Sequence, residues 1–306
     1  MKPAARLYVL LARNSSHAVV FRRGPSKQVL LIKWNLNDDT FELGQWLKGR
    51  VYERRCDLSP EGDMLLYFAA NWRKPYQSWS AISRPPFFTA LALWPKGDGW
   101  GGGGQFLSRD CIELNHRQLE MKLADGFDLP NWLSLKPFGD RPGWGEDDPI
   151  WSSRLLREGW KLTAYPEKTK DDYGARVWIE YDPPITWEKA HPRWPKKYHL
   201  RMRIMGIKER DGTWYIIEHS ILGEKGYTGA IGRSEWADWS SDGALLFAQS
   251  GCLYRLRPTK GQFGPIEESK QIANFNNLAF SRVEPIEYSQ SWPPARSKPS
   301  RKQTRR

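Results

Sequence analysis

The sequence has few of the features that mark several common protein classes. Its 306 residues include only three cysteines, Cys56, Cys111 and Cys252, which are far apart and lack the spacing of a zinc site. We therefore expect reduced, mostly buried thiols rather than a disulfide framework. No apolar run approaches the roughly 20 residues that a membrane helix needs, and the short run at 7–12 lacks a signal-peptide cleavage pattern. These absences predict a cytoplasmic protein without a membrane span.

Long stretches without glycine or proline are also scarce. The chain has 26 glycines and 22 prolines, which leave little room for long helices. Its 17 Trp, 12 Tyr and 12 Phe favour strands and large buried contacts. Polar and apolar residues alternate over 198–204, Asp211-Gly212 is typical of a hairpin turn, and an apolar strand returns over 213–218. We therefore predict an all-β protein.

Two further strands are predicted from weaker patterns. Alternation over 175–181 predicts a strand that stops at Asp182, because two prolines follow it and cannot donate to a ladder. Apolar residues at every second position towards the end of 105–125 predict mostly strand there, with room for one short helix.

The charge of the chain is unevenly distributed. Lys and Arg number 47 against 35 Asp and Glu, for a formal net charge of +12. The stretch 291–306 has no acidic residue and little to bury, so we expect a disordered basic tail after a folded domain at 1–290. Half of the net charge lies in that tail, on Arg296, Lys298, Arg301, Lys302, Arg305 and Arg306.

Two segments far apart in the chain resemble each other. Segments 57–67 and 238–248 share Asp, Ser, an acidic residue, Gly and Leu at a constant offset of 181 residues. The shared order predicts a strand end, a tight turn capped by the hydroxyl of Ser59 or Ser240, a glycine at positive φ, and a new buried strand.

This order of residues resembles the Asp-x-Ser-Pro-Asp-Gly repeat of TolB-type and Trp-Asp-type β-propellers. In those folds each blade is a four-stranded antiparallel sheet of roughly 40–45 residues. The resemblance implies a β-propeller of roughly five or six four-stranded blades with irregular loops. It is good at 52–71 and 233–257 and weak at 88–107, and a β-sandwich or another all-β fold stays open as an alternative.

Signatures of common catalytic and cofactor sites are absent. No Gly-Lys-Ser/Thr follows the glycines at 101–104, and the histidines and cysteines lack metal-ligand spacing. There is no Gly-x-Ser-x-Gly elbow of a hydrolase. The sequence therefore predicts no metal and no cofactor, and it favours a non-catalytic protein while leaving an enzyme open.

A propeller without a catalytic signature favours a scaffold that binds a protein or peptide partner through loops at one end of its channel. Two loops rich in tryptophan, one with glycines and one with acidic residues, are the candidates. The predicted contact residues are Trp94, Trp100, Gly101, Gly102, Gly103 and Gly104 in a mobile first loop, and Trp144, Glu146, Asp147 and Asp148 in the second.

Two alternative functions use other features of the sequence. A nucleic-acid-associated protein would neutralise phosphates with the basic tail and stack bases on a loop that interleaves cations with aromatic residues. The residues of that loop are Arg193, Trp194, Lys196 and Lys197. A glycan-binding or hydrolytic propeller would use paired carboxylates beside tryptophans.

Overall fold

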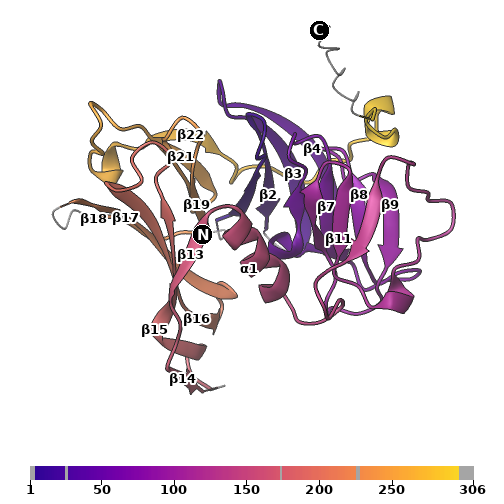
Figure 1. Ribbon diagram of the computed structural model, residues 1–306, viewed down its shortest axis with the longest axis horizontal. Coiled ribbons are helices and arrows are strands. Elements are labelled where there is room, and N and C mark those ends of the chain that lie inside the picture. The colour runs from indigo at the N-terminus through magenta and orange to yellow at the C-terminus, as the bar shows by residue number, and fades with distance from the viewer. Residues whose placement is uncertain (1–3, 25–26, 173, 225–227, 296–306) are drawn as a thin grey trace, which may run out of the picture.

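Strands dominate the structure. The computed structural model describes residues 4–24, 27–172, 174–224 and 228–295. Within those ranges the chain forms five β-sheets and one α-helix, α1 (Asp148–Arg157) (Figure 1). The prediction of an all-β fold is confirmed. No helix of the described part is long and apolar enough to cross a membrane. The short 3-10 helices are η1 (Glu53–Arg55), η2 (Gln118–Glu120), η4 (Ile266–Glu268) and η5 (Glu287–Gln290).

The five sheets follow one another along the chain. Sheet A is an antiparallel meander of β1 (Arg6–Leu11), β2 (His17–Arg23), β3 (Gln28–Asn35) and β4 (Thr40–Lys48). Sheet B contains β5 (Arg50–Val51), β6 (Asp57–Leu58), β7 (Leu65–Ala70), β8 (Ser78–Ser83) and β9 (Ala90–Pro95). Sheet C contains β10 (Gly104–Ser108), β11 (Cys111–Leu114) and β12 (Ser134–Pro137), with β12 parallel to β11.

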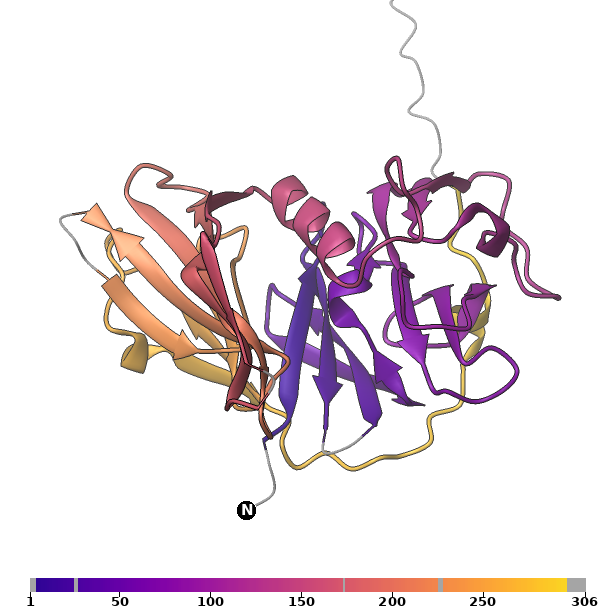
Figure 2. The same cartoon turned by 90° about the horizontal axis from the view of Figure 1, so that it is seen from below.

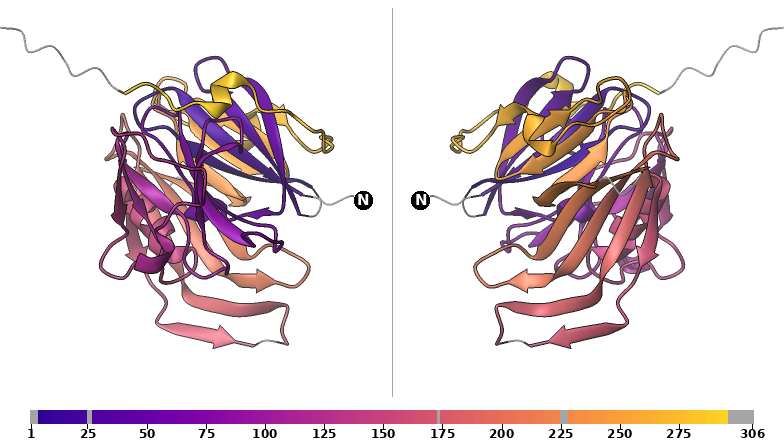
Figure 3. Two further views of the ribbon diagram at one scale, coloured as in Figure 1. Left: turned by 90° about the vertical axis from the view of Figure 1, so that its right-hand side faces the viewer. Right: turned by 90° about the vertical axis from the view of Figure 1, so that its left-hand side faces the viewer.

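The two remaining sheets follow α1. Sheet D contains β13 (Trp160–Ala164), β14 (Lys168–Asp171), β15 (Val177–Ala190), β16 (Tyr198–Glu209), β17 (Tyr215–Gly223) and β18 (Thr228–Arg233). Sheet E is a meander of β19 (Trp236–Trp239), β20 (Leu245–Gln249), β21 (Cys252–Leu256) and β22 (Lys270–Asn274). Figure 3 shows the end of sheet D with β14 and β15 projecting beyond the other sheets.

Inner strands bury side chains on both of their faces. In β20, Leu246 packs with sheet A, whereas Leu245 and Phe247 pack with sheet D. In β7, Leu65 packs with sheet A, whereas Leu66 packs with sheet C. Since neighbouring residues of a strand point to opposite faces, each of these strands joins two neighbouring sheets. The sheets therefore pack face to face in the order D–E–A–B–C.

Helix α1 lies between the two ends of this series (Figure 2). It contacts β10 of sheet C and β13 of sheet D. Pro149 stands in its first turn, where a missing N–H costs nothing, and Gly159 follows its end at φ +88°. Its buried Arg154 donates to the carbonyl of Cys56 and the hydroxyl of Tyr8, which ties the helix to sheets B and A.

The two repeated corners have the same hydrogen bonds. Gly62 and Gly243 both have positive φ, +79° and +83°, and their N–H groups donate to the carbonyls of Ser59 and Ser240. The Ser59 hydroxyl accepts the N–H of Asp63 at 3.1 Å, and the Ser240 hydroxyl accepts the equivalent N–H of Ala244 at 3.1 Å. The predicted corner is therefore present in both sheets B and E, each followed by a buried strand.

Other local predictions are confirmed only in part. The hairpin around Asp211, at φ +58°, joins β16 to β17 as predicted. The strand predicted to stop at Asp182 instead continues as β15 to Ala190, because a bulge between Glu180 and Ile185 removes the prolines from the ladder. The stretch 105–125 is strand only at β10 and β11 and then turns through η2. Cys56 and Cys252 are buried free thiols, as predicted.

The C-terminal segment returns along sheet A towards sheets B and C (Figure 2). Phe280 packs on Trp46 at a ring distance of 6.0 Å, and the carbonyl of Val283 accepts Nε2 of Gln45. Trp292 meets Trp132 edge to face at 6.0 Å. Trp292, two residues beyond the predicted domain boundary at 290, therefore still packs on the folded body. The six cations predicted in the tail lie outside the described residues.

The corner serines are predicted to contribute to stability through their hydroxyls. Ser59→Ala leaves the buried N–H of Met64 without its acceptor, and a buried donor without a partner costs about 1–3 kcal/mol. We expect Ser59→Ala to lower the free energy of unfolding by about that amount in urea titrations. Ser240→Ala should lower it by less, because the N–H of Ala244 keeps a carboxylate oxygen of Asp242 as an acceptor. The exposed Ser134→Ala variant is the control, with an expected change within about 0.5 kcal/mol. An effect of Ser59→Ala no larger than that of the control would contradict this role of the hydroxyl.

Candidate functional site

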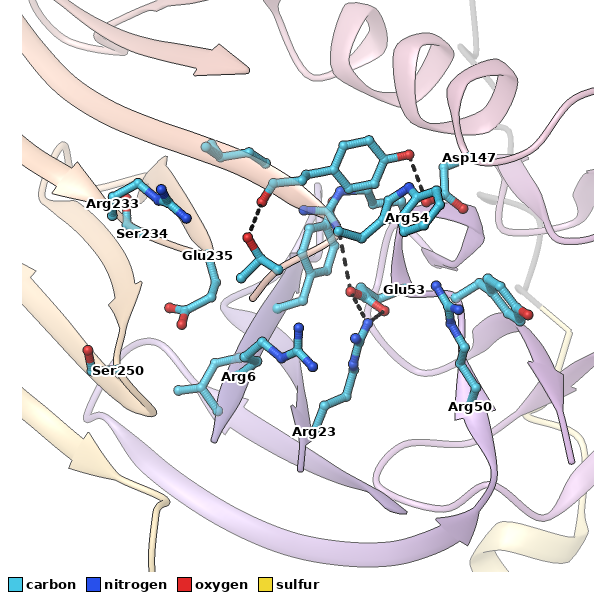
Figure 4. A pocket seen from close by; sticks show the side chains of 17 residues that line it. Arg6, Arg23, Arg50, Glu53, Arg54, Asp147, Arg233, Ser234, Glu235 and Ser250 are labelled. Carbon is cyan, nitrogen blue, oxygen red and sulfur yellow. Dashed lines mark hydrogen bonds and ion pairs between the residues drawn. The ribbon is translucent and has the colours of Figure 1, made fainter. Parts of the chain in front are cut away.

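A cavity of about 220 Å³ opens where four of the sheets and the start of α1 meet. Its lining comes from β1 and β2 of sheet A, β5 and η1 of sheet B, β17 and β18 of sheet D, and the turns that flank β19 to β21 of sheet E. Figure 4 shows the side chains that line it. Arginines outnumber carboxylic acids in this lining: they are Arg6, Arg23, Arg50, Arg54 and Arg233, against Glu53, Asp147 and Glu235.

Glu53 neutralises two of the arginines. Its carboxylate lies 2.6 Å from Nη1 of Arg23 and 3.3 Å from Nη1 of Arg54. Burial alone would raise the pKa of Glu53, but the two guanidinium groups lower it to about 2. Glu53 is therefore a permanent carboxylate that holds Arg23 and Arg54 in place.

Aromatic rings enclose Arg54. Its guanidinium carbon lies 4.4 Å from the ring centre of Tyr215, 4.7 Å from that of Trp151 and 5.1 Å from that of Tyr8. The hydroxyl of Tyr215 in turn donates to Asp147 at 3.0 Å. These contacts fix Arg54 as part of the cavity wall, since a cation over several ring faces is held without a second counter-ion.

Asp147 lines the cavity, and both of its carboxylate oxygens accept a hydrogen bond. It accepts Nε of the buried Arg55 at 2.7 Å as well as the Tyr215 hydroxyl. Nη1 of Arg55 donates to the carbonyls of Gly99 and Gly101. This network connects the floor of the cavity to the glycine loop.

The positive charges of Arg6 and Arg50 are not neutralised by a carboxylate of the described chain. Neither has an ion-pair partner among the described residues, and both side chains are exposed at the cavity mouth. Arg6, Arg23 and Arg50 extend side by side in Figure 4. Burial and the charge of Arg23 lower the pKa of Arg6, which indicates that the positive charges repel one another there. An anion placed among them would relieve this repulsion.

The register of sheet A brings two of these charges together. Arg6 of β1 stands directly opposite Arg23 of β2. Like charges at directly opposite positions destabilise an antiparallel pair. A local cost of this kind at a cavity is typical of a residue kept for binding rather than for folding. The pairing follows from counting back from the hairpin between β1 and β2, so the sequence contained a signal for it, although neither arginine was among the predicted contact residues.

Glu235 differs from the other carboxyl groups of the cavity. One of its oxygens, Oε2, is buried and has no hydrogen-bond partner among the described residues. Burial raises the pKa of Glu235 to about 7. Ser234 beside it is held by Nδ1 of the buried His219 at 2.8 Å.

The predicted contact residues occupy different environments. Trp94 is fully buried in β9 and is a core residue rather than a contact residue. Trp100 and Trp144 are 41% and 64% exposed and meet edge to face at 5.8 Å, so the structure brings the two predicted aromatic loops together. Asp147 lines the cavity, whereas Glu146 and Asp148 are exposed outside it.

The glycine loop was predicted to be mobile, but the structure shows it tightly packed. A Cβ at Gly102 would lie 2.4 Å from the ring of Phe68, and a Cβ at Gly103 would lie 2.1 Å from the carbonyl oxygen of Arg55. These glycines allow the backbone to approach its neighbours closely, and their φ values of +81° and +76° exclude most other residues. Gly101 also has positive φ, and Gly104 begins β10.

The loop residues of the nucleic-acid alternative, which are those the structure describes, do not line the cavity. Arg193 and Lys196 are exposed, but Trp194 is stacked on the buried His191 at 4.8 Å, so one face of its ring is covered. Lys197 donates to the carbonyl of Gly261. No group of three or more His, Cys, Asp or Glu side chains in the described part of the chain is arranged to hold a metal ion.

Comparisons with known proteins give only distant likenesses. No protein-family model matches the chain, and no curated protein matches it. An uncharacterized protein, lmo1340, from Listeria monocytogenes EGD-e is 8% identical with a TM-score of 0.24, and the match covers 86% of this chain and 65% of that one.

Two further solved structures have similarly low sequence identity and TM-score. The β-propeller domain of the Trilobed protease from Pyrococcus furiosus is 10% identical with a TM-score of 0.31, covering 90% of this chain and all of that one. A putative 6-phosphogluconolactonase from Bacteroides fragilis is 10% identical with a TM-score of 0.32. The match covers 87% of this chain and 95% of that one. At these scores the likenesses say nothing about ligand or activity.

Glu53 is predicted to stabilise the fold in a pH-dependent way. Because its pKa is lowered from 4.5 to about 2, its contribution is present above pH 4.5 and is lost as the pH falls towards 2. Glu53→Gln should lower the free energy of unfolding at pH 7 by about 3 kcal/mol, since it leaves two guanidinium groups unpaired. The difference from wild type should shrink steadily in denaturant titrations between pH 4.5 and 2. A difference that is constant with pH would contradict this account, and exposed Glu284→Gln is the control.

Arg6 is predicted to lower stability. Arg6→Gln removes the charge opposite Arg23 and keeps much of the side-chain length, so the free energy of unfolding should rise by up to about 1 kcal/mol. The gain should shrink at high salt, which screens the repulsion. Arg282→Gln, at an exposed ion pair with Glu284, provides the control with no gain. A loss of stability in Arg6→Gln would show that the cation is a structural element.

Proposed function

We propose that this protein is a propeller-like binding protein that recognises an acidic group of a protein or peptide partner in its arginine-lined cavity. The observation that carries this proposal is the presence of two unpaired arginines, Arg6 and Arg50, beside the fixed Arg23–Glu53 pair. Arginine clusters recognise carboxylates and phosphates through charge-assisted, bidentate hydrogen bonds. No catalytic group is needed for this role.

The size of the cavity favours an anchored side chain or chain end over a whole small molecule. Sites for drug-sized ligands enclose about 300–1,000 Å³. The 220 Å³ here is smaller and suits one acidic group. The remainder of such a ligand would lie on the surface around the mouth, which is the arrangement expected of a peptide segment that inserts one residue.

The exposed tryptophans lie next to that mouth. Tyr52 lines the cavity, and its hydroxyl is 3.8 Å from the position of a Cβ on Gly99. Trp100 follows Gly99 and contacts Trp144, and the ring of Trp72 lies 3.4 Å from the same Cβ position on Gly99. Exposed tryptophans supply most of the binding free energy at many interfaces. We propose Trp100 and Trp144 as contacts for residues that flank the acidic group.

The alternative partners share part of this chemistry. A nucleic acid would present phosphates to the same arginines, and an acidic glycan would present carboxylates. The proposal of a peptide is favoured because the cavity admits a single group, and because Trp194 of the predicted nucleic-acid loop is already stacked on His191. Both alternatives remain outcomes of the binding test.

Binding of acidic peptides tests this proposal. We would measure, by fluorescence polarisation, labelled nonapeptides with one central Glu flanked by Trp or Pro, and matched peptides with Gln in its place. The Glu peptides should bind at least tenfold more tightly, since a hydrogen bond to a charged group is worth about 1.5–3 kcal/mol. Arg6→Gln and Arg50→Gln should each remove most of that preference for Glu peptides. Trp100→Ala should weaken the binding of Glu and Gln peptides to the same extent.

The control variant is Arg282→Gln, which removes an exposed cation away from the cavity. It should leave peptide affinity unchanged, which separates a local effect from the overall positive charge. Equal affinity for Glu and Gln peptides, or full retention in Arg6→Gln, would overturn the proposal. Tighter binding of single-stranded RNA with a steep salt dependence would favour the nucleic-acid alternative.

A further inference from the structure

We infer that Glu235 binds the ligand anion as a carboxylic acid, so that the cavity takes up a proton when it takes up an anion. This inference rests on the proposed function and adds a specificity-determining residue to the same site. Its structural basis is the buried and unpartnered Oε2 of a carboxyl group that lines an arginine-rich cavity.

The hydrogen bonding of the cavity leaves Glu235 as the exception. Glu53 is satisfied by Arg23 and Arg54, and Asp147 by Arg55 and Tyr215. Glu235 has no ion pair within the described residues, although Arg6 lies on the same side of the cavity in Figure 4. A buried carboxylate oxygen without a partner costs free energy, and protonation of the carboxyl group removes the charge that makes this cost largest.

Several other titratable groups surround Glu235. Burial and Arg54 lower the pKa of His219 to about 3, so His219 stays neutral. Burial raises the pKa of Glu158, and this residue therefore needs a control variant. The charged and titratable groups that line the cavity or the adjoining pocket with Glu235 are Arg6, Tyr8, Arg23, Arg50, Tyr52, Glu53, Arg54, Asp147, Arg154, Glu158, Tyr215, His219, Arg233 and Asp238.

The protonation state of Glu235 determines whether its side chain attracts or repels an anion. The neutral acid donates its O–H to an anionic oxygen, whereas the carboxylate can only accept and repels the anion. When an anion enters the cavity above neutral pH, the carboxylate therefore takes one proton from solvent. The pKa of Glu235 in the free protein, about 7, places this exchange in the accessible range. Binding raises that pKa further, so affinity is full at acidic pH and falls as the pH rises.

The test uses sulfate, an anion that does not titrate between pH 6 and 9. Isothermal titration calorimetry should show an affinity about twentyfold lower at pH 8.5 than at pH 6.5. At pH 8, titrations in Tris and in triethanolamine, which have different ionisation enthalpies, should report uptake of close to one proton per sulfate bound. Glu235→Gln keeps an N–H donor in place of the acid and should bind sulfate with the same affinity at every pH, without proton uptake.

Matched variants separate the possible failures. Glu158→Gln should keep the pH dependence of wild type, and Arg6→Gln should lose sulfate binding at every pH. If Glu235→Gln keeps the pH dependence, or Glu158→Gln loses it, the inference is overturned while the anion site stands. If wild type does not bind sulfate at pH 6, the anion site and the inference both fail.

Discussion

Burial on both faces of the inner strands is the constraint on which the rest of this structure depends. Neighbouring residues of β20 pack towards sheets D and A, and neighbouring residues of β7 pack towards sheets A and C. A sheet of this kind is stable only when apolar partners cover both sides, because each uncovered face would leave several large side chains in water. The sheets therefore stack in series, and α1 covers the gap between the two ends of the series.

The cavity is a consequence of that stacking. Strands from several sheets end near one another, and charged residues at strand ends reach water there while the apolar residues beside them stay in the core. Arg6, Arg23 and Arg50 gather at this place from three different strands. Sheet A accepts a like-charged pair across β1 and β2, which is a local conflict in an otherwise consistent fold.

The carboxyl groups of the cavity divide the arginines into two sets. Glu53 and Asp147 are permanent partners that fix Arg23, Arg54 and Arg55 as parts of the wall. Arg6 and Arg50 are left without a counter-ion in the described chain. A ligand therefore meets a rigid wall with an unneutralised charge, which is the preorganisation that lowers the cost of binding. The exposed Trp100 and Trp144 extend the same surface beyond the mouth.

Much of the fold was predictable from the sequence, but only a few residues of the site were. Aromatic content and frequent turn residues predicted an all-β protein, Asp211-Gly212 predicted the hairpin between β16 and β17, and the Ser59 and Ser240 corners were recognised as equivalent. Trp100 and Trp144 were chosen as contacts from two different loops and do meet. Trp94 could not be told from them, because a buried and an exposed tryptophan look alike in a single sequence.

By itself the sequence determined the strands, the hairpin turn and the repeated corners, because alternation, positive φ and side-chain capping act between residues a few positions apart. Only the tertiary structure decided which charges share a cavity. Arg6, Arg54, Asp147 and Glu235 are far apart along the chain and meet because sheets pack in the order D–E–A–B–C, with α1 at the join. That order arises from non-local contacts between faces, and the same packing sets how deeply each carboxyl group is buried and which of them stays without a partner.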